Sequence, residues 1–409
     1  MNIGILGGAF DPFHKGHESL IKGAFKSKLV DVVIVVPSGR SPFKPGHMIS
    51  PAPYRYYMTK EAVGSDFKDE PVFVSDIEMT YSGTSFTINT LRELSKPTYI
   101  RTFLESNGVD LKRVKENHKY YWITGSDVLT SFEKWHEPEK ILKIAGMLVA
   151  SRPADGVDIK EQVKRLELLF GFKPDIQTFD IKGVEAASSD IRISRDYKNV
   201  PDSVADFIRT HALYEGDPFE GASDEACECF YEYAIKLYRY LGQNRLLHTL
   251  NVGILSLKYA RIYDKNLCDR ALIAGELHDC AKELDEKQQR DMAYELVGDL
   301  FTEKKILHSP AGAVLASREF GITDPGILDA ITYHTTGRGG MTLLEKIVYL
   351  ADKLEPSRTY ADLSKERELA VTDIDAALRM CVKSTKKKFE SRGQKVHPLT
   401  VDFMKDILL

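Results

Sequence analysis

The sequence predicts two domains, an α/β domain with a doubly wound parallel sheet followed by an all-α helical bundle. Strand-like and helical segments alternate through the first half, strand patterns end before residue 213, and helical periodicity dominates from residue 225 onward. The length of 409 residues also exceeds the span of most single hydrophobic cores. We therefore expect a first domain over 1–216, a linker over 217–224 and a second domain over 225–409.

Five β-rich apolar runs are expected to form the sheet. They are mostly continuous rather than alternating, which is typical of strands covered on both faces. Helical patterns such as 17–27 and 85–96 lie between them, so the strands are expected to be parallel with crossover helices. The expected strands are residues 2–6, 31–37, 71–77, 120–125 and 145–151.

The second half begins after a stretch rich in glycine, proline and acidic residues at 213–225, which is interpreted as a linker. Beyond it, residues 227–243 place six aromatic and aliphatic side chains on one helix face, which is more typical of a core than of a binding stripe. The lysines at 386–388 are interpreted as a solvated helix face.

The composition is that of an ordinary globular protein, 43% hydrophobic and 28% charged, with a net charge of −4. Without a basic excess, neither nucleic acids nor membrane surfaces are expected as partners. No apolar run approaches the roughly 20 residues of a membrane span, and the first residues have a strand pattern rather than that of a signal peptide. Five scattered cysteines do not form a disulfide framework, so we expect a cytoplasmic protein, for which a homo-oligomer stays open.

The stretch GILGGAFDPFHKGH, residues 4–17, combines a strand, a glycine turn and a helix start. Gly7 and Gly8 allow close approach of the backbone to a ligand, and the first amides of a helix favour an anion. His14 and His17 lie on the first helical turn and can face the same phosphates. No Gly-Lys-Ser/Thr follows, so this is not a Walker loop. The alternative is two polar residues near a helix cap.

This stretch resembles the GxFDPxHxGH signature of the adenylyl- and cytidylyltransferase superfamily, whose members share a Rossmann-like fold and an HxGH motif. The resemblance implies that both histidines stabilise the triphosphate while a substrate phosphate attacks the α-phosphorus of ATP directly. It also implies Mg²⁺ bound with ATP and no covalent enzyme intermediate.

Four later segments resemble motifs of bacterial nicotinate-nucleotide adenylyltransferases: GSDVLTSFEKW at 125–135, SFTINTLREL at 85–94, SSDIRIS at 188–194, and the segment 200–214. The implied substrates are ATP and nicotinate mononucleotide. Trp135 and the GSD segment argue against the related pantetheine-phosphate adenylyltransferases. Three departures are noted: Phe86 replaces a tyrosine, Ala187 replaces a serine, and 97–119 is interpreted as an insertion.

The resemblance implies two groups of binding residues in this half. Four of them, His14, His17, Lys44 and Arg192, carry catalytic roles. The nicotinate nucleotide is expected to contact Lys44, Thr87 and Trp135. The expected ATP contacts are Gly7, Gly8, Phe10, His14, His17, Gly125, Asp127, Ser188, Ser189 and Arg192.

In the second half, four histidines and two aspartates lie in separate apolar helical segments. Imidazoles and carboxylates placed in this way are typical of a metal site in a bundle core, because an aspartate in an apolar helix is costly unless it is paired or metal-bound. The candidates are His248, His278, Asp279, His308, His334 and Asp352.

The stretches HDCAKEL, LHSPAGA, YHTTGRGGMTLLEKIVYLADKLEPSR and KVHPLT resemble the HD-domain symmetrical bis(5′-nucleosyl)-tetraphosphatases over about 244–400. The resemblance implies hydrolysis of diadenosine tetraphosphate to two ADP at a dinuclear centre of divalent ions, with Fe or Mn favoured by the mixed ligands. His248, His278, Asp279 and Asp352 would hold one ion, and Asp279 would bridge to a second held by His308 and His334. Asp279 and Lys282 are the implied catalytic residues. The expected phosphate contacts are Lys282, Thr335, Thr336, Gly337, Arg338 and Arg358.

The sequence therefore predicts a bifunctional enzyme. Two alternatives are kept for the second domain: a metal-stabilised nucleotide sensor without turnover, and hydrolysis of a different nucleotide.

Overall fold

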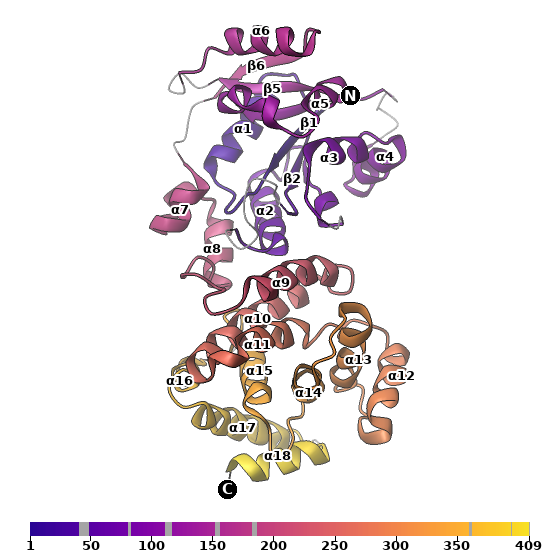
Figure 1. The fold of residues 1–409 in the computed structure, drawn as a ribbon, viewed down its shortest axis with the longest axis vertical. Coiled ribbons are helices and arrows are strands. Elements are labelled where there is room, and N and C mark those ends of the chain that lie inside the picture. The colour runs from indigo at the N-terminus through magenta and orange to yellow at the C-terminus, as the bar shows by residue number, and fades with distance from the viewer. Residues whose placement is uncertain are drawn as a thin grey trace. The chain divides into compact units, whose positions relative to one another are not determined.

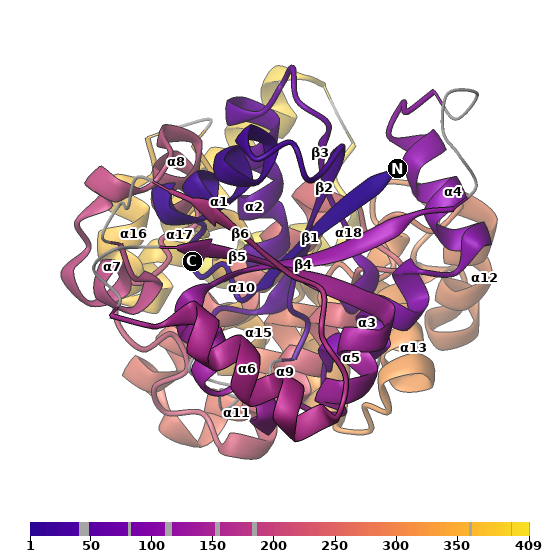
Figure 2. The same ribbon diagram turned by 90° about the horizontal axis from the view of Figure 1, so that it is seen from above.

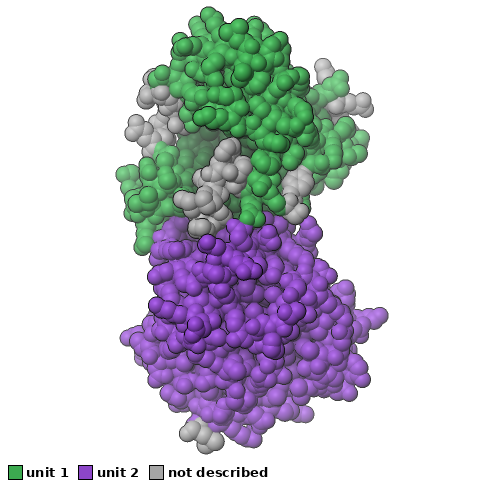
Figure 3. Space-filling model, viewed as in Figure 1, with its two compact units in different colours: residues 1–209 green, residues 210–409 purple. Residues whose placement is uncertain are grey.

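The structure is a computed structural model, and the chain divides into two compact units, Met1–Arg209 and Thr210–Leu409 (Figure 3). Each unit is described by itself, with the element labels of Figure 1. The structure describes residues 1–40, 49–80, 83–110, 117–151, 156–181, 186–359, 362–393 and 395–408.

The first unit is built on a six-stranded parallel sheet with the order β3-β2-β1-β4-β5-β6, as expected for a doubly wound α/β domain. All five expected strands are present, although the third is short because a 3₁₀ helix at Ile77–Met79 follows it. The sixth strand was not predicted, because only Phe179 among its residues is buried. The strands are β1 (Asn2–Gly8), β2 (Val32–Pro37), β3 (Val72–Val74), β4 (Lys119–Gly125), β5 (Ala145–Ser151) and β6 (Ile176–Asp180).

The strand order reverses between β1 and β4, which pair in parallel (Figure 2). From β1 the sheet continues to β2 and β3 on one side, and from β4 to β5 and β6 on the other. In open α/β sheets, ligands bind outside the carboxyl ends of the strands at such a reversal. The residues at these two ends are Gly8 and Gly125.

Eight helices are described in the first unit. The expected insertion at 97–119 contributes one of them, α4, whose Ile100 and Leu104 are 1% and 0% exposed and join the core around the sheet. The insertion is thus part of the packed unit where it is described. The helices are α1 (Lys15–Lys26), α2 (Ala52–Asp66), α3 (Thr87–Leu94), α4 (Pro97–Ser106), α5 (Pro138–Ile144), α6 (Ile159–Phe170), α7 (Ser188–Ser194) and α8 (Asp202–Thr210).

The second unit is helical throughout its described residues, as predicted. Its α10 and α11 pack closely through glycines: a Cβ atom on Gly275 would lie 2.6 Å from Ser256 Oγ and 2.8 Å from the Val252 carbonyl oxygen. The helices are α9 (Asp224–Leu237), α10 (Gln243–Tyr263), α11 (Cys268–Leu277), α12 (Glu286–Val297), α13 (His308–Phe320), α14 (Pro325–Tyr333), α15 (Leu343–Leu354), α16 (Ser364–Ala370), α17 (Ile374–Ser391) and α18 (Pro398–Leu408).

The segment 217–224, expected to be a linker, is part of the second unit and packs against its helices. The Phe219 ring meets the Phe230 ring of α9 with centroids 5.3 Å apart, and the amide of Ser223 donates to Asp269 at 2.8 Å. The lysines at 386–388 are exposed on α17. Among the described residues, none of the helices has the length and apolar character required to span a membrane.

Glu276 is a fully buried carboxyl group in α11, on the helix that leads to the candidate metal residues. Its exposure is 0%, and neither of its carboxyl oxygens has a hydrogen-bond partner among the described residues. Burial raises the pKa of Glu276 well above its usual range, and the neighbouring Cys229 adds to this effect. The neutral form is therefore favoured in the folded chain.

Replacing Glu276 with glutamine is expected to remove a pH-dependent loss of stability. With a raised folded-state pKa, the folded chain keeps a proton that the unfolded chain releases, so stability falls as pH rises above the ordinary value of 4.5. The slope is at most about 1.4 kcal/mol per pH unit. In urea unfolding, the variant should gain stability relative to the unaltered chain between about pH 5 and about pH 8. An equal difference at both pH values would contradict this account.

Candidate functional site

In the first unit, the turn between β1 and α1 brings two histidine side chains together. His14 is the N-cap of α1, and its Nδ1 accepts a hydrogen bond from the amide of Gly16 at 3.1 Å. Nδ1 of His17 accepts in return from the amide of His14, also at 3.1 Å. The pair forms a reciprocal capping box in which imidazoles take the places of the usual hydroxyl and carboxamide. The three-residue spacing of the two histidines thus stabilises the start of α1, and it also suits the binding of a ligand.

The same hydrogen bonds decide where each ring carries its proton. The rings of His14 and His17 are stacked with centroids 3.7 Å apart and an interplanar angle of 22°. Since each Nδ1 is an acceptor, a neutral ring carries its hydrogen on Nε2. Two N–H donors therefore lie side by side at the start of a helix, where the dipole favours an anion. This arrangement suits the oxygens of a phosphate chain.

Phe10 supports the histidine pair from the preceding turn. Its ring is 2% exposed and meets the ring of His17 edge-on, with centroids 4.8 Å apart. Its backbone is left-handed, with a φ of 49°. A Cβ atom on Gly8 would lie 3.1 Å from this ring, so the glycine leaves room for it.

Side chains pack closely over the glycines near the ends of β1 and β4. A Cβ atom on Gly7 would lie 2.3 Å from the Trp122 ring, and one on Gly125 would lie 2.4 Å from the carboxylate of Asp127. Gly125 thus allows the Asp127 side chain to fold over the end of β4. For Gly7 the structure supplies a packing reason, whereas the sequence suggested only approach to a ligand.

The segment that contains α7 docks onto the turn after β1. Arg192 Nη1 donates to the carbonyl oxygen of Asp11 at 2.5 Å, and Ser188 Oγ donates to the carbonyl oxygen of Pro12 at 3.1 Å. The N-cap of α7 is Ala187, which makes no capping bond. Ser189 instead donates to Asp190 at 3.3 Å. The structure therefore brings Ser188 and Arg192 to the histidine turn and leaves Ser189 at the surface.

Arg55 is a residue of this region that the sequence analysis missed. Although it is charged, it is only 1% exposed. It donates to the carbonyl oxygens of Ser50 at 2.7 Å, Ala9 at 2.9 Å and Gly39 at 2.7 Å. It thereby ties the turn after β1 to the segments around residues 39 and 50. Its partners lie far apart in the sequence, so no motif marked it.

Two of the residues expected to contact the nicotinate nucleotide, Thr87 and Trp135, lie among the described residues. The Trp135 ring meets the Trp122 ring edge-on with centroids 6.1 Å apart, and Trp122 is the side chain against which Gly7 packs. Trp135 is half-buried, so it is partly core and partly accessible. Thr87 is the first residue of α3, whose N-cap is Phe86. Lys44 lies outside the described residues.

In the second unit, six side chains converge from five helices or their ends. One carboxylate oxygen, Asp352 Oδ1, lies 3.1 Å from His248 Nε2 and 3.7 Å from His278 Nε2. These three residues have ligand atoms within 4.8 Å of one another, as metal ligands require. The six residues are His248 in α10, His278 and Asp279 after α11, His308 at the start of α13, His334 after α14, and Asp352 in α15.

Asp279 is the centre of the second group. Its Oδ1 lies 3.2 Å from His308 Nε2 and 3.3 Å from His334 Nε2, and its Oδ2 lies 3.6 Å from His278 Nε2. His278, Asp279 and His334 again have ligand atoms within 4.8 Å of one another. Because His278 belongs to both groups, the structure brings all six predicted residues into one continuous cluster.

Two orphaned atoms test whether this cluster fits a metal ion. Neither His278 Nε2 nor Asp279 Oδ1 has a hydrogen-bond partner among the described residues, although both atoms are buried. Nδ1 of His278 donates to the Gly275 carbonyl oxygen, and Nδ1 of His334 donates to the Ile331 carbonyl oxygen, each at 2.7 Å. Both rings therefore turn the lone pair of Nε2 toward carboxylate oxygens. Such facing acceptors need a cation between them, so the residues fit a divalent ion.

The protonation states of His278, His308, Asp279 and Asp352 agree with that fit, whereas for His248 burial would lower the pKa but hydrogen bonds to Asp352 and Glu355 raise it. Burial lowers the pKa of His278 to about 3 and that of His308 to about 4, so both rings are neutral at physiological pH. Burial would raise the pKa of Asp279, but the neighbouring His278, His308 and His334 hold it well below its usual range. Burial would also raise the pKa of Asp352, but the neighbouring His248 and Lys353 hold it well below its usual range. Neutral imidazoles and ionised carboxylates are the forms that bind metals.

Four cationic side chains lie around the cluster, and one of them is Lys353, whose Nζ lies 3.7 Å from Asp352 Oδ2. Arg245 Nη1 lies 2.5 Å from Asp279 Oδ2, and Arg358 Nη2 lies 2.9 Å from Asp352 Oδ1. Lys282 Nζ lies 2.9 Å from His308 Nε2 and 4.0 Å from Asp279 Oδ1. Lys282 and Arg358 were expected here, whereas Arg245 was missed. Its place one helical turn before His248 is the signal that could have found it.

The remaining phosphate candidates follow α14. Thr335 Oγ1 lies 3.1 Å from His308 Nε2, within reach of the cluster. Thr336 is 2% exposed, and its hydroxyl has no hydrogen-bond partner among the described residues. Gly337 has a φ of 64°, and a Cβ atom there would lie 2.5 Å from the Phe403 ring of α18.

Arg338 makes contacts with residues outside the six-residue cluster. Its Nη2 pairs with Asp329 at 2.9 Å and its Nε with Glu345 at 2.7 Å. Its guanidinium also lies 4.1 Å above the Tyr333 ring. These ion pairs give Arg338 a structural role as a link between helices. Its contact with a substrate phosphate stays a prediction.

Family models of known proteins match the two halves of the chain separately. A family model described as Cytidylyltransferase-like matches residues 5–192, and an HD domain model matches residues 245–357. A relative in Mycoplasma pneumoniae, named a probable nicotinate-nucleotide adenylyltransferase/Ap4A hydrolase, is 26% identical over 94% of this chain and 96% of its own length.

Two relatives correspond to one half each. The symmetrical bis(5′-nucleosyl)-tetraphosphatase of Bacillus subtilis is 37% identical over 39% of this chain and 87% of its own length. A probable nicotinate-nucleotide adenylyltransferase of Desulfitobacterium hafniense is 32% identical over 52% of this chain and 95% of its own length.

Proposed function

Because the chain belongs to the nicotinate-nucleotide adenylyltransferase family in its first half and to the HD-domain family of symmetrical bis(5′-nucleosyl)-tetraphosphatases in its second, we propose that it is a bifunctional enzyme. The first unit transfers the adenylyl group of ATP to nicotinate mononucleotide, giving deamido-NAD and pyrophosphate. The second unit hydrolyses diadenosine tetraphosphate to two ADP. The observation that carries the proposal is the six-residue His/Asp cluster in the same chain as the paired histidines.

In the first reaction, a phosphate oxygen of nicotinate mononucleotide attacks the α-phosphorus of ATP, and the bond to pyrophosphate breaks. The Nε2–H groups of His14 and His17 donate to phosphate oxygens on which charge accumulates. Arg192, fixed by the carbonyl oxygen of Asp11, adds a fixed positive charge beside them. Mg²⁺ that arrives with ATP supplies further neutralisation. Gly125 with Asp127 receives the adenosine end, and Trp135 with Thr87 receives the nicotinate ring.

For the second reaction, His248, His278, Asp279, His308, His334 and Asp352 would hold two divalent ions, with Fe or Mn favoured by the mixed nitrogen and oxygen ligands. When bound there, the ions would supply Lewis-acid chemistry and activation of a water. Arg245, Lys282 and Arg358 neutralise the phosphate chain, and Thr335 can donate to its oxygens. The carbonyl groups of Gly275 and Ile331 keep the rings of His278 and His334 in their orientation.

Two assays of the full chain test the two activities separately. Chromatography after incubation with ATP and nicotinate mononucleotide should show deamido-NAD and pyrophosphate. Incubation with diadenosine tetraphosphate and Mn²⁺ or Fe²⁺ should yield ADP alone. Transfer without hydrolysis under any metal would favour the sensor alternative for the second unit. Products other than ADP would favour a different nucleotide substrate.

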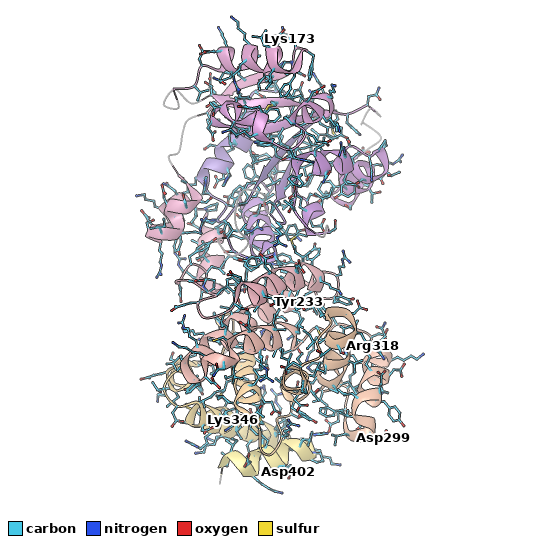
Figure 4. All side chains as sticks on the ribbon, viewed as in Figure 1. Lys173, Tyr233, Asp299, Arg318, Lys346 and Asp402 are labelled. Atoms are coloured by element: carbon cyan, nitrogen blue, oxygen red, sulfur yellow. The ribbon has the colours of Figure 1, made fainter. Side chains whose placement is uncertain are left out.

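Replacing Arg245 with alanine is expected to weaken binding of diadenosine tetraphosphate. The guanidinium of Arg245 lies at the cluster, so the alanine variant loses a charge-assisted hydrogen bond to the substrate. We expect KM for diadenosine tetraphosphate to rise about tenfold. Steady-state kinetics at several salt concentrations measures the change. Arg318 of α13 (labelled in Figure 4), which pairs with Glu295 of α12, is the matched control, and Arg318→Ala should leave KM unaltered. An equal effect of both variants would contradict a local role for Arg245.

A further inference from the structure

A line of hydrogen bonds leads away from the metal cluster into the second unit. His248 Nδ1 bonds Glu355 Oε1 at 3.0 Å, and Glu355 Oε2 accepts from Asn251 Nδ2 at 2.9 Å. The same amide nitrogen bonds His211 Nδ1 at 3.0 Å. Glu355 and Asn251 are 1% and 3% exposed, so the line runs through the interior.

The donors and acceptors along this line leave one consistent assignment. Glu355 accepts at both oxygens, because Ser357 donates its hydroxyl at 2.6 Å and its amide at 2.8 Å. His248 must then carry a hydrogen on Nδ1, which leaves Nε2 for the cluster.

Asn251 connects Glu355 with His211 in this line of hydrogen bonds, because its NH₂ group has two hydrogens and each has an acceptor. One hydrogen goes to Glu355 and the other to His211. Glu355 accepts hydrogen bonds at both oxygens, so it fixes the NH₂ group of Asn251, rather than the amide oxygen, toward itself. The ring nitrogen that faces the same NH₂ group, His211 Nδ1, must then carry the lone pair. His211 therefore takes the second hydrogen and holds the amide in the orientation that supports Glu355.

The place of His211 in the chain is unexpected for a residue of this site. It is the second residue of the second unit and directly follows α8. The segment that matches the HD domain model begins only at residue 245. The hydrogen bonds that orient His248, a candidate metal ligand, thus include His211, which lies outside the residues matched by the HD domain model.

We infer that His211 and Asn251 are positioning residues of the metal centre, which act through Glu355 to hold His248 in its ligating orientation. The inference rests on the proposed metal site, but not on the nucleotide that this site hydrolyses. His211 touches neither metal nor substrate. Its contribution is to fix the amide of Asn251, and its effect should therefore depend on Asn251.

The test is Mn²⁺ binding to the full-length chain without nucleotide, followed by electron paramagnetic resonance of free Mn²⁺. His211→Ala should raise the dissociation constant about tenfold, the lower end of the range for residues that orient metal ligands. Asn251→Leu should raise it at least as much, because Glu355 loses a donor. His211→Gln, whose side-chain oxygen can accept from Asn251, should restore the affinity.

A double variant separates this line from a general loss of stability. Adding His211→Ala to Asn251→Leu should cause no further loss of Mn²⁺ affinity, because the link is already broken. Tyr263→Phe removes a different hydrogen bond of α10, to the Ala370 carbonyl oxygen, and should leave the affinity unaltered.

Three results would overturn the inference: unaltered affinity in His211→Ala, additive losses in the double variant, or an equal loss in Tyr263→Phe. A lack of saturable Mn²⁺ binding by the unaltered chain would instead contradict the proposed metal site itself. Saturable binding without turnover of diadenosine tetraphosphate would support the inference and contradict the proposed substrate.

Discussion

Asp279→Asn should abolish hydrolysis of diadenosine tetraphosphate while adenylyl transfer continues at its normal rate. Asp279 is the residue around which His278, His308 and His334 gather, with oxygen–nitrogen distances of 3.2 to 3.6 Å. The amide has the same shape but no charge, so the divalent ions lose their shared carboxylate. Loss of several kcal/mol of transition-state stabilisation corresponds to a rate decrease of about 10³-fold.

The measurement is ADP formation by the full-length variant at saturating Mn²⁺, with deamido-NAD formation followed in the same preparation. Asp299, an exposed carboxylate of the same unit (Figure 4), provides the matched control, and Asp299→Asn should leave both rates unaltered. Retention of hydrolysis in Asp279→Asn would place the chemistry elsewhere. Loss of both activities would indicate a folding defect rather than the loss of a ligand.

The reciprocal result is expected for His17→Gln, which should lower the kcat of adenylyl transfer about 10²–10³-fold and leave hydrolysis intact. The imidazole supplies an Nε2–H donor to the phosphate chain, and glutamine at this position cannot place a donor in the same way. Glutamine is nevertheless a favoured third residue of a helix capping box, so its oxygen can still accept from the amide of His14.

This choice of variant separates catalysis from the helix start. The thermal midpoint of the first unit should stay unaltered in His17→Gln, whereas His17→Ala should also lose the cap, about 1 kcal/mol. If the glutamine variant transfers adenylyl groups normally, the histidine pair serves only to begin α1. That outcome would favour the alternative stated for this motif, two polar residues near a helix cap.

The parts of both sites that depend on local spacing could be predicted from the sequence. His14 and His17 are three residues apart, and their hydrogen bonds close within one helical turn. The six candidate metal residues stand out because charged or polar groups interrupt apolar helices, where a lone charge is costly. The six side chains lie together in the structure, and their order along the chain indicated the metal site.

The parts that depend on distant partners could not be predicted. Arg55 is buried because carbonyl groups 16 and 46 positions away surround it, and its neighbours in the sequence give no sign of this. Arg245 reaches Asp279 from 34 positions away. Strand β6 was missed for a related reason, since an edge strand with one buried residue lacks the apolar run that marks the central strands.

The position of His211 limits where the two halves can be cut apart for separate study. A fragment that begins after the glycine- and proline-rich stretch at 213–225 would contain all six metal-cluster residues, yet it would lack the acceptor for Asn251. Such a fragment should fold and show weakened metal affinity, and an assay of it alone would underestimate the hydrolase. A gene designed to express the second half should therefore start no later than the codon for Thr210, the first residue of that unit.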